Sequence, residues 1–312
     1  ESPGWYAGVG KVADPGPDTW GRPAWWSQWE LEHRAARDNV IVMDMSFMGK
    51  FMVHGRDAGH CLNRISANNV DGATGEITYT QWLNTQGKLE ADLTVTKLAD
   101  DRFFVVVTDT MVRHAETWMK RNIPDGAHAF VTDVTSGYGQ LNVQGPRSRE
   151  LLQSLTSVDL SNAAFPFRAA REIDIGYARV LCTRITYLGE LGYELFIPAD
   201  QAVHVYDQVV AAGKEFGVVH AGLRALGSLR MEKGYRDYGH DLDNTDDPYE
   251  TGLGFAVDLK KPDGFIGKDA LLERKAKGPL QRRLVSVLVK DPEPQMFHAE
   301  IVYRDGKAVG YV

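Results

Sequence analysis

Apolar and polar positions alternate along the chain in two ways, with a period of two over short runs and a period near 3.6 over longer ones. The short runs predict strands, at residues 40–43, 49–53, 77–83, 92–98, 103–108, 139–143, 177–187 and 193–197. The longer periods predict helices, at residues 27–38, 111–121, 148–155, 203–210 and 223–233. Hairpins therefore alternate with single helices twice over, which favours α+β units with antiparallel sheets over one parallel sheet.

Two of the predicted helices begin with capping signals. Ser27 is followed three residues later by Glu30, which is the pattern of a capping box. Asp200 stands just before the helix that carries Val203 and Val209 on one face. We therefore expect Ser27 and Asp200 to cap their helices.

The pattern divides the chain into four parts. Residues 1–26 are rich in Gly and Pro, and indicate an extension; residues 27–135 and 136–278 carry the two α+β units. From residue 279 onward, runs 283–289 and 300–303 indicate strands, and Asp305-Gly306 is a hairpin turn signal. We expect 279–312 to begin an all-β unit that is cut short. The chain lacks an initiating Met, so we expect a processed or excised piece of a longer protein.

Composition excludes several classes of function. The 312 residues carry a net charge of −7 without a cluster of basic residues, so we expect no nucleic-acid partner. No apolar run approaches the length of a membrane span, and no signal peptide is recognisable. The nine His and two Cys show no metal-ligand spacing, so we expect no metal site. Two cysteines also suit a reducing compartment.

The first candidate for chemistry is Asp92, a lone carboxylate that begins a predicted strand with one apolar face. A strand-end Asp of this kind commonly caps a turn. A buried Asp could instead stabilise an iminium cation or take a proton. The residues alone leave both interpretations open.

The second candidate is the run 187–194, in which Gly189 and Gly192 bracket a tight turn between Glu190 and Glu194. Glycine there lets the backbone approach another group closely. A Glu that leaves a strand among Tyr and Leu is costly unless it is paired. Glu194 therefore forms either a salt bridge across the sheet or an acceptor for two parallel N–H groups of a flat heterocycle.

The third candidate is the helix 223–233, where Arg224 and Arg230 stand among apolar positions with Glu232 nearby. A structural Arg–Glu pair is the simpler interpretation. An Arg that reaches into a cavity to meet a carboxylate-bearing ligand is the alternative.

Together these segments resemble the aminomethyltransferase (glycine cleavage T-protein) family, from about residue 20 to 312. The chain is most similar in kind to the folate-binding C-terminal region of dimethylglycine and sarcosine dehydrogenases and oxidases. Six ordered blocks carry the resemblance: residues 21–25, 43–46, 83–95, 143–148, 187–194 and 249–254. The runs 92–95 and 189–194 are the most specific.

The resemblance implies a cloverleaf of two α+β units and a β-barrel, here truncated, around a central folate pocket. It implies that Asp92 is the essential carboxylate and that Glu194 grips the pterin edge. Tyr79 and Tyr187 would line the pocket, and Arg230 would stand at its wall. Tetrahydrofolate would be the cofactor, and FAD would belong to a flavin domain in front of residue 1 or to a flavoprotein subunit.

Departures from the family pattern favour the dehydrogenase-linked branch. Ala91 stands where the T-protein pattern has a second Asp, Gly87-Lys88 where it has two glycines, and the strand near Thr108 lacks an Asn. The expected activity is transfer of an iminium or formaldehyde carbon, from oxidative demethylation of an N-methylamine, to give 5,10-methylenetetrahydrofolate. We expect a bacterial cytoplasmic or mitochondrial matrix protein. Two alternatives are a true T-protein that takes an aminomethyl group from a lipoyl carrier, and a non-catalytic module that binds or regulates a flavoenzyme; demethylation of a methyl ether or sulfonium compound onto folate is a third.

Overall fold

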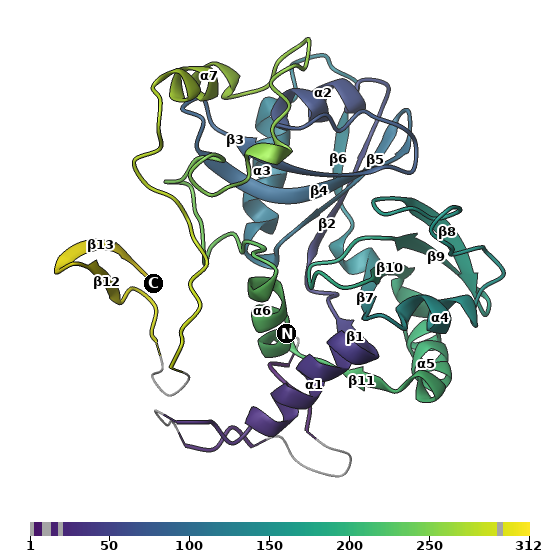
Figure 1. Ribbon diagram of the computed structural model, residues 1–312. Helices are drawn as coiled ribbons and strands as arrows, with labels where there is room; N and C mark the ends of the chain where they lie inside the picture. Colours follow the sequence, from purple (N-terminus) through teal and green to yellow (C-terminus); the bar gives the residue numbers. More distant parts are fainter. Residues whose placement is uncertain (1–2, 8–13, 18–20, 292–295) are drawn as a thin grey trace.

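A computed structural model describes residues 3–7, 14–17, 21–291 and 296–312. The predicted extension 1–26 therefore lies partly outside the described residues. Two antiparallel-rich sheets, each with helices against one face, make up the body, and a small hairpin stands apart from it near the C-terminus (Figure 1). This confirms the α+β class with antiparallel sheets.

The larger sheet has six strands in the order β11-β1-β7-β10-β9-β8. All neighbours are antiparallel except β1 and β11, which pair in parallel. The strands span Val218–His220 (β11), Val40–Asp44 (β1), Tyr138–Gln144 (β7), Gly192–Pro198 (β10), Ala178–Thr183 (β9) and Ala170–Ile175 (β8). Because β1 joins a sheet formed mainly by residues after 137, the chain must cross to the second sheet directly after Asp44.

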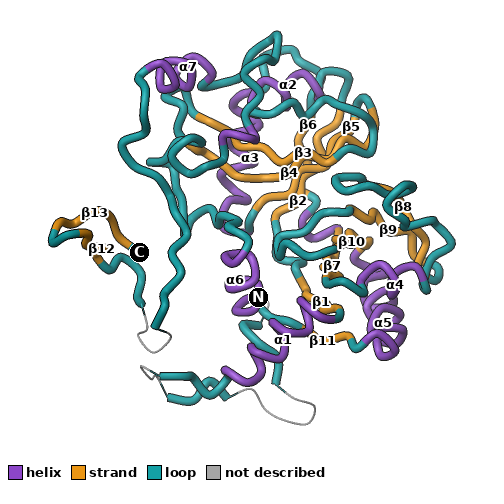
Figure 2. Tube along the Cα trace, in the orientation of Figure 1, coloured by secondary structure: helices purple, strands orange, loops and turns teal. Residues whose placement is uncertain are grey.

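The second sheet has five antiparallel strands in the order β3-β4-β5-β2-β6. They span Ile77–Leu83 (β3), Leu89–Ala99 (β4), Arg102–Val107 (β5), Gly49–His54 (β2) and Phe130–Asp133 (β6). The link 45–48 thus connects β1 of one sheet to β2 of the other (Figure 2). The predicted domain boundaries remain a prediction.

Seven α-helices occur in the described residues: α1 (Trp26–Asp38), α2 (Ala58–Ile65), α3 (Val112–Asn122), α4 (Ser148–Gln153), α5 (Ala202–Gly213), α6 (Leu223–Glu232) and α7 (Lys268–Ala276). Short 3-10 turns occupy Asp109–Met111, Thr135–Gly137, Ala199–Gln201, Lys214–Phe216 and Gly254–Ala256. The sequence pattern did not predict α2 or α7.

Both predicted N-caps are wrong. Helix α1 begins at Trp26, with Trp25 in the N-cap position, so Ser27 already lies inside the first turn. Asp200 lies inside the 3-10 turn that precedes α5, whose N-cap is Gln201. In each case the N-cap lies one or two residues from the predicted position. Helix ends are uncertain by about that much when they are read from sequence patterns.

Each sheet buries one face beneath helices. Because side chains alternate between the two faces of a strand, every second residue points to the helix-covered face. In the five-stranded sheet Phe51, Leu93 and Val105 belong to a core shared with α2 and α3. In the six-stranded sheet Val143 and Leu195 belong to a core shared with α4 and α5. The residues between these positions must point to the opposite faces.

The opposite faces of the two sheets meet at a junction built around Phe104 of β5 and Phe196 of β10. Their rings are 5.0 Å apart at 73°, and the Tyr138 ring lies 5.6 Å from Phe104. Phe104 and Phe196 are fully buried, and Val106 beside them is buried. Edge-to-face aromatic contact therefore joins the two sheets.

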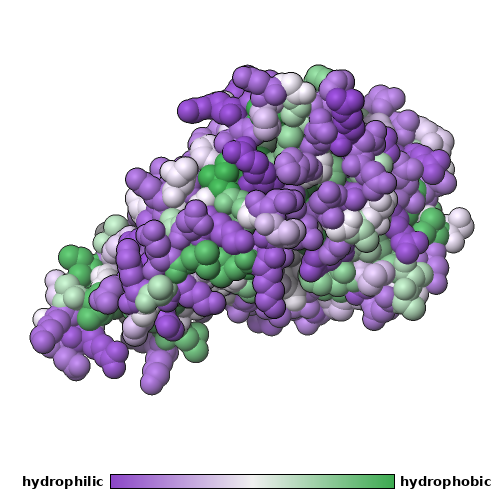
Figure 3. Space-filling model, turned by 90° about the horizontal axis from the view of Figure 1, so that it is seen from above, coloured by the Kyte–Doolittle hydropathy of each residue, from purple (hydrophilic) through white to green (hydrophobic). Residues whose placement is uncertain are grey.

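The C-terminal segment differs from the prediction. Residues 283–289 form no strand, because no neighbouring strand in the described chain offers them a partner, and an isolated strand is not stable. Strands β12 (Ile301–Arg304) and β13 (Lys307–Tyr311) do form a hairpin around Asp305-Gly306. No closed barrel occurs in the described residues. Apolar side chains such as Ile301 and Tyr311 are exposed in this hairpin. Figure 3 shows hydrophobic atoms at the surface of the part that projects from the body.

Truncation at the junction should destabilise the protein. For Phe104→Ala we expect a loss of about 3–5 kcal/mol in the free energy of unfolding, because a fully buried ring leaves a cavity between two rigid sheets. Chemical denaturation monitored by tryptophan fluorescence measures this. The matched control is Phe167→Ala, whose ring is 59% exposed and should change the free energy little. Equal losses in the two variants would contradict the assigned role of the junction.

Candidate functional site

Asp92 lies inside β4 and not at its start, because the strand begins at Leu89. Its register partner on β3 is Gln81. The Tyr79 hydroxyl donates to Oδ2 of Asp92 at 2.8 Å, and Nε2 of Gln81 donates to Oδ1 at 2.9 Å. The turn-capping interpretation is therefore wrong, and β3 instead holds both oxygens of the carboxylate.

The Asp92 carboxyl has an unusual affinity for its proton. Burial raises its pKa to about 6, although the hydrogen bonds from Tyr79 and Gln81 lower it. Asp237 raises this pKa further and Arg236 lowers it. Burial, followed by the nearby Asp92, raises the pKa of Tyr79 far above its ordinary value, so this phenol stays a donor. Asp92 can thus gain or lose a proton close to neutral pH, as a general acid–base group requires.

Glu194 lies on β10 opposite Asn142 of β7, and Nδ2 of Asn142 is 3.4 Å from its Oε1. Burial raises the pKa of Glu194 to about 7, against the lowering effects of Asn142 and Lys50. No Lys or Arg in the described chain lies within ion-pair distance of Glu194. The cross-sheet salt bridge is therefore wrong, and most of the carboxylate's acceptor capacity is unused by the protein.

Lys50 of β2 is a fully buried ammonium near this carboxylate. Its Nζ donates to the carbonyl oxygens of Ser46 at 2.9 Å and Met48 at 2.8 Å. Burial lowers its pKa to about 8, while Asp44 and Glu194 act in the opposite direction. Lys50 therefore fixes the link between the sheets and contributes positive charge at the junction.

Strand register shows that both carboxylates face this junction. Asp92 and Thr94 share one face of β4, and Thr94 pairs with Val106, a member of the junction cluster. Glu194 alternates with Phe196 on the same face of β10. Residues two apart in a strand point to the same side. Asp92 and Glu194 therefore project from the two faces that meet.

Tyr187 and Arg230 come from segments that flank the junction. The Tyr187 hydroxyl donates to the carbonyl of Arg236, and its ring stacks on Tyr235 at 6.2 Å. Burial raises the pKa of Tyr187, and Asp92 is among the charges that raise it further. Tyr187 therefore lies close enough to Asp92 for the charge of that carboxylate to affect its pKa.

Arg230 is buried, but its partner is not a Glu. Its guanidinium bonds the carboxylate of Asp241, and Asp237 lies 3.8 Å away. Glu232 instead pairs with Arg37 at 2.7 Å. The predicted Arg–Glu pair within this helix is therefore wrong. Arg224 has a different role again, because its guanidinium lies over the Trp25 ring at 4.0 Å.

The two glycines of the 189–192 turn make room for protein side chains. Gly189 has φ +74°, and a Cβ there would meet the Lys233 side chain at 2.2 Å. A Cβ on Gly192 would meet Gln144 at 2.8 Å. Glu190 beside them pairs with Arg37 at 2.6 Å. The close approach predicted from the sequence is therefore explained by packing within the chain.

Sequence reasoning missed Gln81, Asn142 and Lys50, which contact or charge the two carboxylates. All three are buried polar residues on strands. A Gln two residues after Tyr79 was the available signal, because it shares a strand face with that tyrosine. The pairing that brings it to Asp92 needs the hairpin register.

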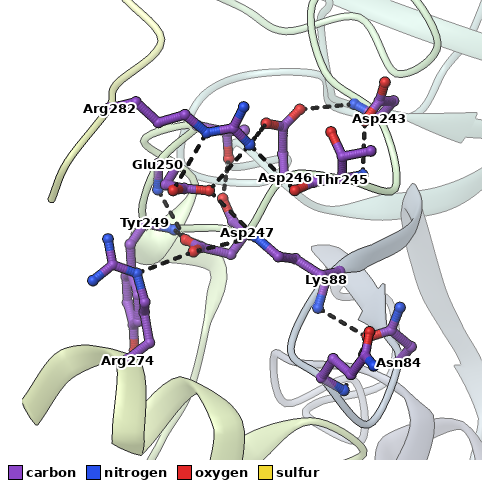
Figure 4. A network of polar contacts seen from close by, with 12 residues as sticks. Asn84, Lys88, Asp243, Thr245, Asp246, Asp247, Tyr249, Glu250, Arg274 and Arg282 are labelled. Carbon is purple, nitrogen blue, oxygen red and sulfur yellow. Dashed lines mark hydrogen bonds and ion pairs between the residues drawn. The ribbon is translucent and has the colours of Figure 1, made fainter. Parts of the chain in front are cut away.

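A separate hollow of about 420 Å³ lies between the β3–β4 turn and α7. Buried Asp247 organises its edge (Figure 4). Its Oδ1 accepts from the backbone N–H groups of Tyr249 at 2.8 Å and Glu250 at 3.0 Å, while Oδ2 lies 3.4 Å from Arg274 and 3.9 Å from Lys88. This network ties the 243–250 segment to the five-stranded sheet and α7. None of the sequence-predicted site residues lines it.

Other site classes find no support in the part of the chain that the structure describes. It contains no group of three His, Cys, Asp or Glu side chains able to hold a metal ion. No helix there is long and apolar enough to cross a membrane. Cys61 and Cys182 are both buried and free, and burial raises the pKa of each thiol, which opposes thiolate chemistry.

Most of the chain is similar to known proteins. The model of the GCVT N-terminal domain family matches residues 1–261. The chain is 40% identical over 311 residues to a 4-methylaminobutanoate oxidase (formaldehyde-forming) of Paenarthrobacter nicotinovorans, covering 99% of this chain and 37% of that protein. It is 37% identical over 292 residues to mitochondrial sarcosine dehydrogenase of Homo sapiens, covering 89% and 32%. The chain thus spans about a third of the length of these two relatives.

A solved structure also matches the fold. It is the glycine cleavage system aminomethyltransferase T from Bartonella henselae, with a TM-score of 0.71 and 25% identity. The match covers 81% of this chain and 67% of that one. The fold inferred from hairpins and single helices is therefore shared with a known aminomethyltransferase structure.

Removal of the Asp247 carboxylate should loosen the edge of the five-stranded sheet. For Asp247→Ala we expect a loss of about 2–3 kcal/mol in the free energy of unfolding, because two backbone N–H groups and two partly exposed cations lose their acceptor. Urea denaturation measures it. Asp207→Ala, an exposed position on α5, is the control and should be nearly neutral. A neutral Asp247→Ala would show that the network adds little.

Proposed function

The chain belongs to the GCVT N-terminal domain family, and from that premise we propose that it transfers a one-carbon unit to tetrahydrofolate. The observation that carries the proposal is the pair of carboxylates, Asp92 and Glu194, whose pKa values of about 6 and 7 are raised by burial on two facing sheet surfaces. Perturbed titratable groups of this kind cluster at functional sites.

The residues present fit a reduced pterin. Glu194 has one long hydrogen bond from Asn142 and can accept two further N–H groups side by side. Tyr79 and Tyr187 offer aromatic surface near Asp92. Arg230 is held by Asp241, so we assign it to the wall of the site as a support for the neighbouring segment, and not as a free cation.

Tetrahydrofolate supplies two N–H nitrogens that together take up the carbon of formaldehyde or an iminium ion, giving 5,10-methylenetetrahydrofolate and releasing water or the protonated amine. In this proposal Asp92 steadies the positive charge that develops, and its pKa of about 6 supports a role as proton acceptor near neutral pH. Tyr79 and Gln81 keep its carboxylate in one orientation. Glu194 orients the acceptor by its edge, so that much of the acceleration comes from holding the reactants together.

We further propose an N-methylamine as the source of the carbon. The relative from Paenarthrobacter nicotinovorans is named as a formaldehyde-forming oxidase of 4-methylaminobutanoate, and the human relative as a sarcosine dehydrogenase; both substrates are N-methylamines. A flavin, in another domain or subunit, would be the oxidant. The compartment would be the bacterial cytoplasm or the mitochondrial matrix.

A second candidate is transfer of an aminomethyl group from a lipoyl carrier protein. The likeness to the Bartonella henselae aminomethyltransferase favours it. Ala91 and Lys88, where the T-protein pattern has Asp and Gly, favour the first candidate. Formation of 5,10-methylenetetrahydrofolate from free formaldehyde, but not from an aminomethylated lipoyl carrier, would support the first candidate. The reverse result would support the second.

Substitution of the two carboxylates should separate binding from transfer. For Glu194→Ala we expect tetrahydrofolate binding to weaken about 10- to 100-fold, because a charge-assisted pair of hydrogen bonds is lost. For Asp92→Asn we expect binding within about threefold of wild type but loss of transfer from formaldehyde. Titration calorimetry and the absorbance of product formation measure these. The controls Glu215→Ala and Asp174→Asn remove exposed carboxylates and should behave as wild type. Equal, negligible binding by wild type and both site variants would refute the proposal.

Tetrahydrofolate binding should depend on pH through Glu194. The carboxylate form, which accepts N–H groups, predominates above a pKa of about 7 and is lost as pH falls through it. For a single group we expect Kd to rise about tenfold between pH 8 and pH 6. The pH dependence should disappear in Glu194→Gln, measured by the same titration. A flat wild-type profile across this range would exclude Glu194 as the gripping group.

A further inference from the structure

The side chain of Gln81 has one satisfied end and one unsatisfied end beside Asp92. It lies on β3 and is fully buried. Its Nε2 donates to Oδ1 of Asp92 at 2.9 Å, and its Oε1 has no hydrogen-bond partner. Buried polar atoms without partners are rare in folded proteins, and each calls for an explanation.

The orientation of this amide follows from the chemistry of its neighbour. An ionised carboxylate only accepts hydrogen bonds, so the amide must turn its NH2 group toward Asp92 and its carbonyl away. The other oxygen of Asp92 is already taken by Tyr79. With both oxygens of Asp92 occupied, Oε1 of Gln81 is left without a donor.

Gln81 shares a sheet face with Asp92, because the two are register partners on β3 and β4. That face turns toward the junction with the six-stranded sheet, where Glu194 also points. The unpaired carbonyl is therefore on the ligand side of the proposed site and not in the helix-covered core.

We propose that Gln81 is a second ligand-facing group of the Asp92 site, whose amide nitrogen positions Asp92 and whose carbonyl oxygen accepts a hydrogen bond from an N–H of the bound one-carbon acceptor. The inference rests on the proposed function and names a specificity residue for the same site. An N–H held by Oε1 directs the nitrogen lone pair away from Gln81, toward the incoming carbon. A ligand without that N–H would leave the buried carbonyl unpaired and would bind less tightly.

Several groups besides Gln81 act on Asp92, and the test must separate them. Tyr79 stands on the same strand as Gln81, and Tyr187 comes from the segment before β10. The segment 236–238 contributes the guanidinium of Arg236, the carboxyl of Asp237 and the phenol of Tyr238. Only Gln81 and Tyr79 donate hydrogen bonds to the carboxylate among the described residues.

The decisive experiment compares Gln81→Met and Gln81→Glu with Gln86→Met, an exposed control in the β3–β4 turn. Tetrahydrofolate Kd and the rate of product formation from formaldehyde are measured from pH 5 to pH 9. Gln81→Met removes the donor and the acceptor, and we expect kcat/KM to fall about 10- to 100-fold. The acidic limb of kcat, measured at saturating tetrahydrofolate so that Glu194 does not limit binding, should also move above pH 6 in this variant, because Asp92 loses a donor that favours its charged form.

Gln81→Glu keeps the size of the side chain and an acceptor oxygen but cannot donate when ionised. We expect it to retain tetrahydrofolate binding better than Gln81→Met while moving the acidic limb at least as far upward, since a second negative charge adjoins Asp92. This variant carries the same pH test if Gln81→Met does not fold, as judged by circular dichroism.

The outcomes are distinct. If the wild-type chain binds tetrahydrofolate and the Gln81 variants keep the same Kd, rate and acidic limb, the role of Gln81 is overturned. The proposed function then stays in place. Failure of the wild-type chain to bind tetrahydrofolate overturns both. A loss of rate in Gln81→Met without a shift of the acidic limb marks a purely structural effect, and also overturns the role proposed for Gln81.

Discussion

Contact between two independently supported sheets is the constraint on which the site depends. Each sheet buries one face beneath its own helices, so its position is fixed by an ordinary apolar core. The remaining faces meet through Phe104 and Phe196, which exclude water between them. Asp92 and Glu194 extend from those faces, and their raised pKa values follow from that exclusion. The aromatic contact thus contributes to stability and to the chemistry of the carboxylates together.

Much of the architecture follows from local patterns in the sequence. Strand β3 has the bounds predicted for it, and the hairpin 301–311 forms around the predicted Asp305-Gly306 turn. These elements can be predicted because their signals, alternation of apolar and polar residues and specific turn residues, lie within a short stretch of sequence. Tyr79 and Asp92 were both singled out, but their hydrogen bond depends on the register of β3 and β4, which the sequence did not predict.

What the sequence could not predict required contacts between distant segments. Strand β11 pairs in parallel with β1, across more than 170 residues, and a three-residue strand carries almost no pattern of its own. Arg230 pairs with Asp241 because a loop folds back on α6, whereas the nearer Glu232 points to Arg37. The strand predicted at 283–289 failed for the opposite reason, because the local pattern was adequate but no partner strand was at hand.

The Lys50 clamp has a mechanical consequence. Residues 45–48 form one covalent link between the two sheets, and the buried ammonium of Lys50 donates to two carbonyl oxygens of that link. Stretching or twisting residues 45–48 would break the hydrogen bonds of a buried ammonium. Such a change is costly, because water cannot easily replace the lost acceptors. The Lys50 hydrogen bonds should therefore limit changes in the spacing of the two sheets at this link, whether or not a ligand is bound.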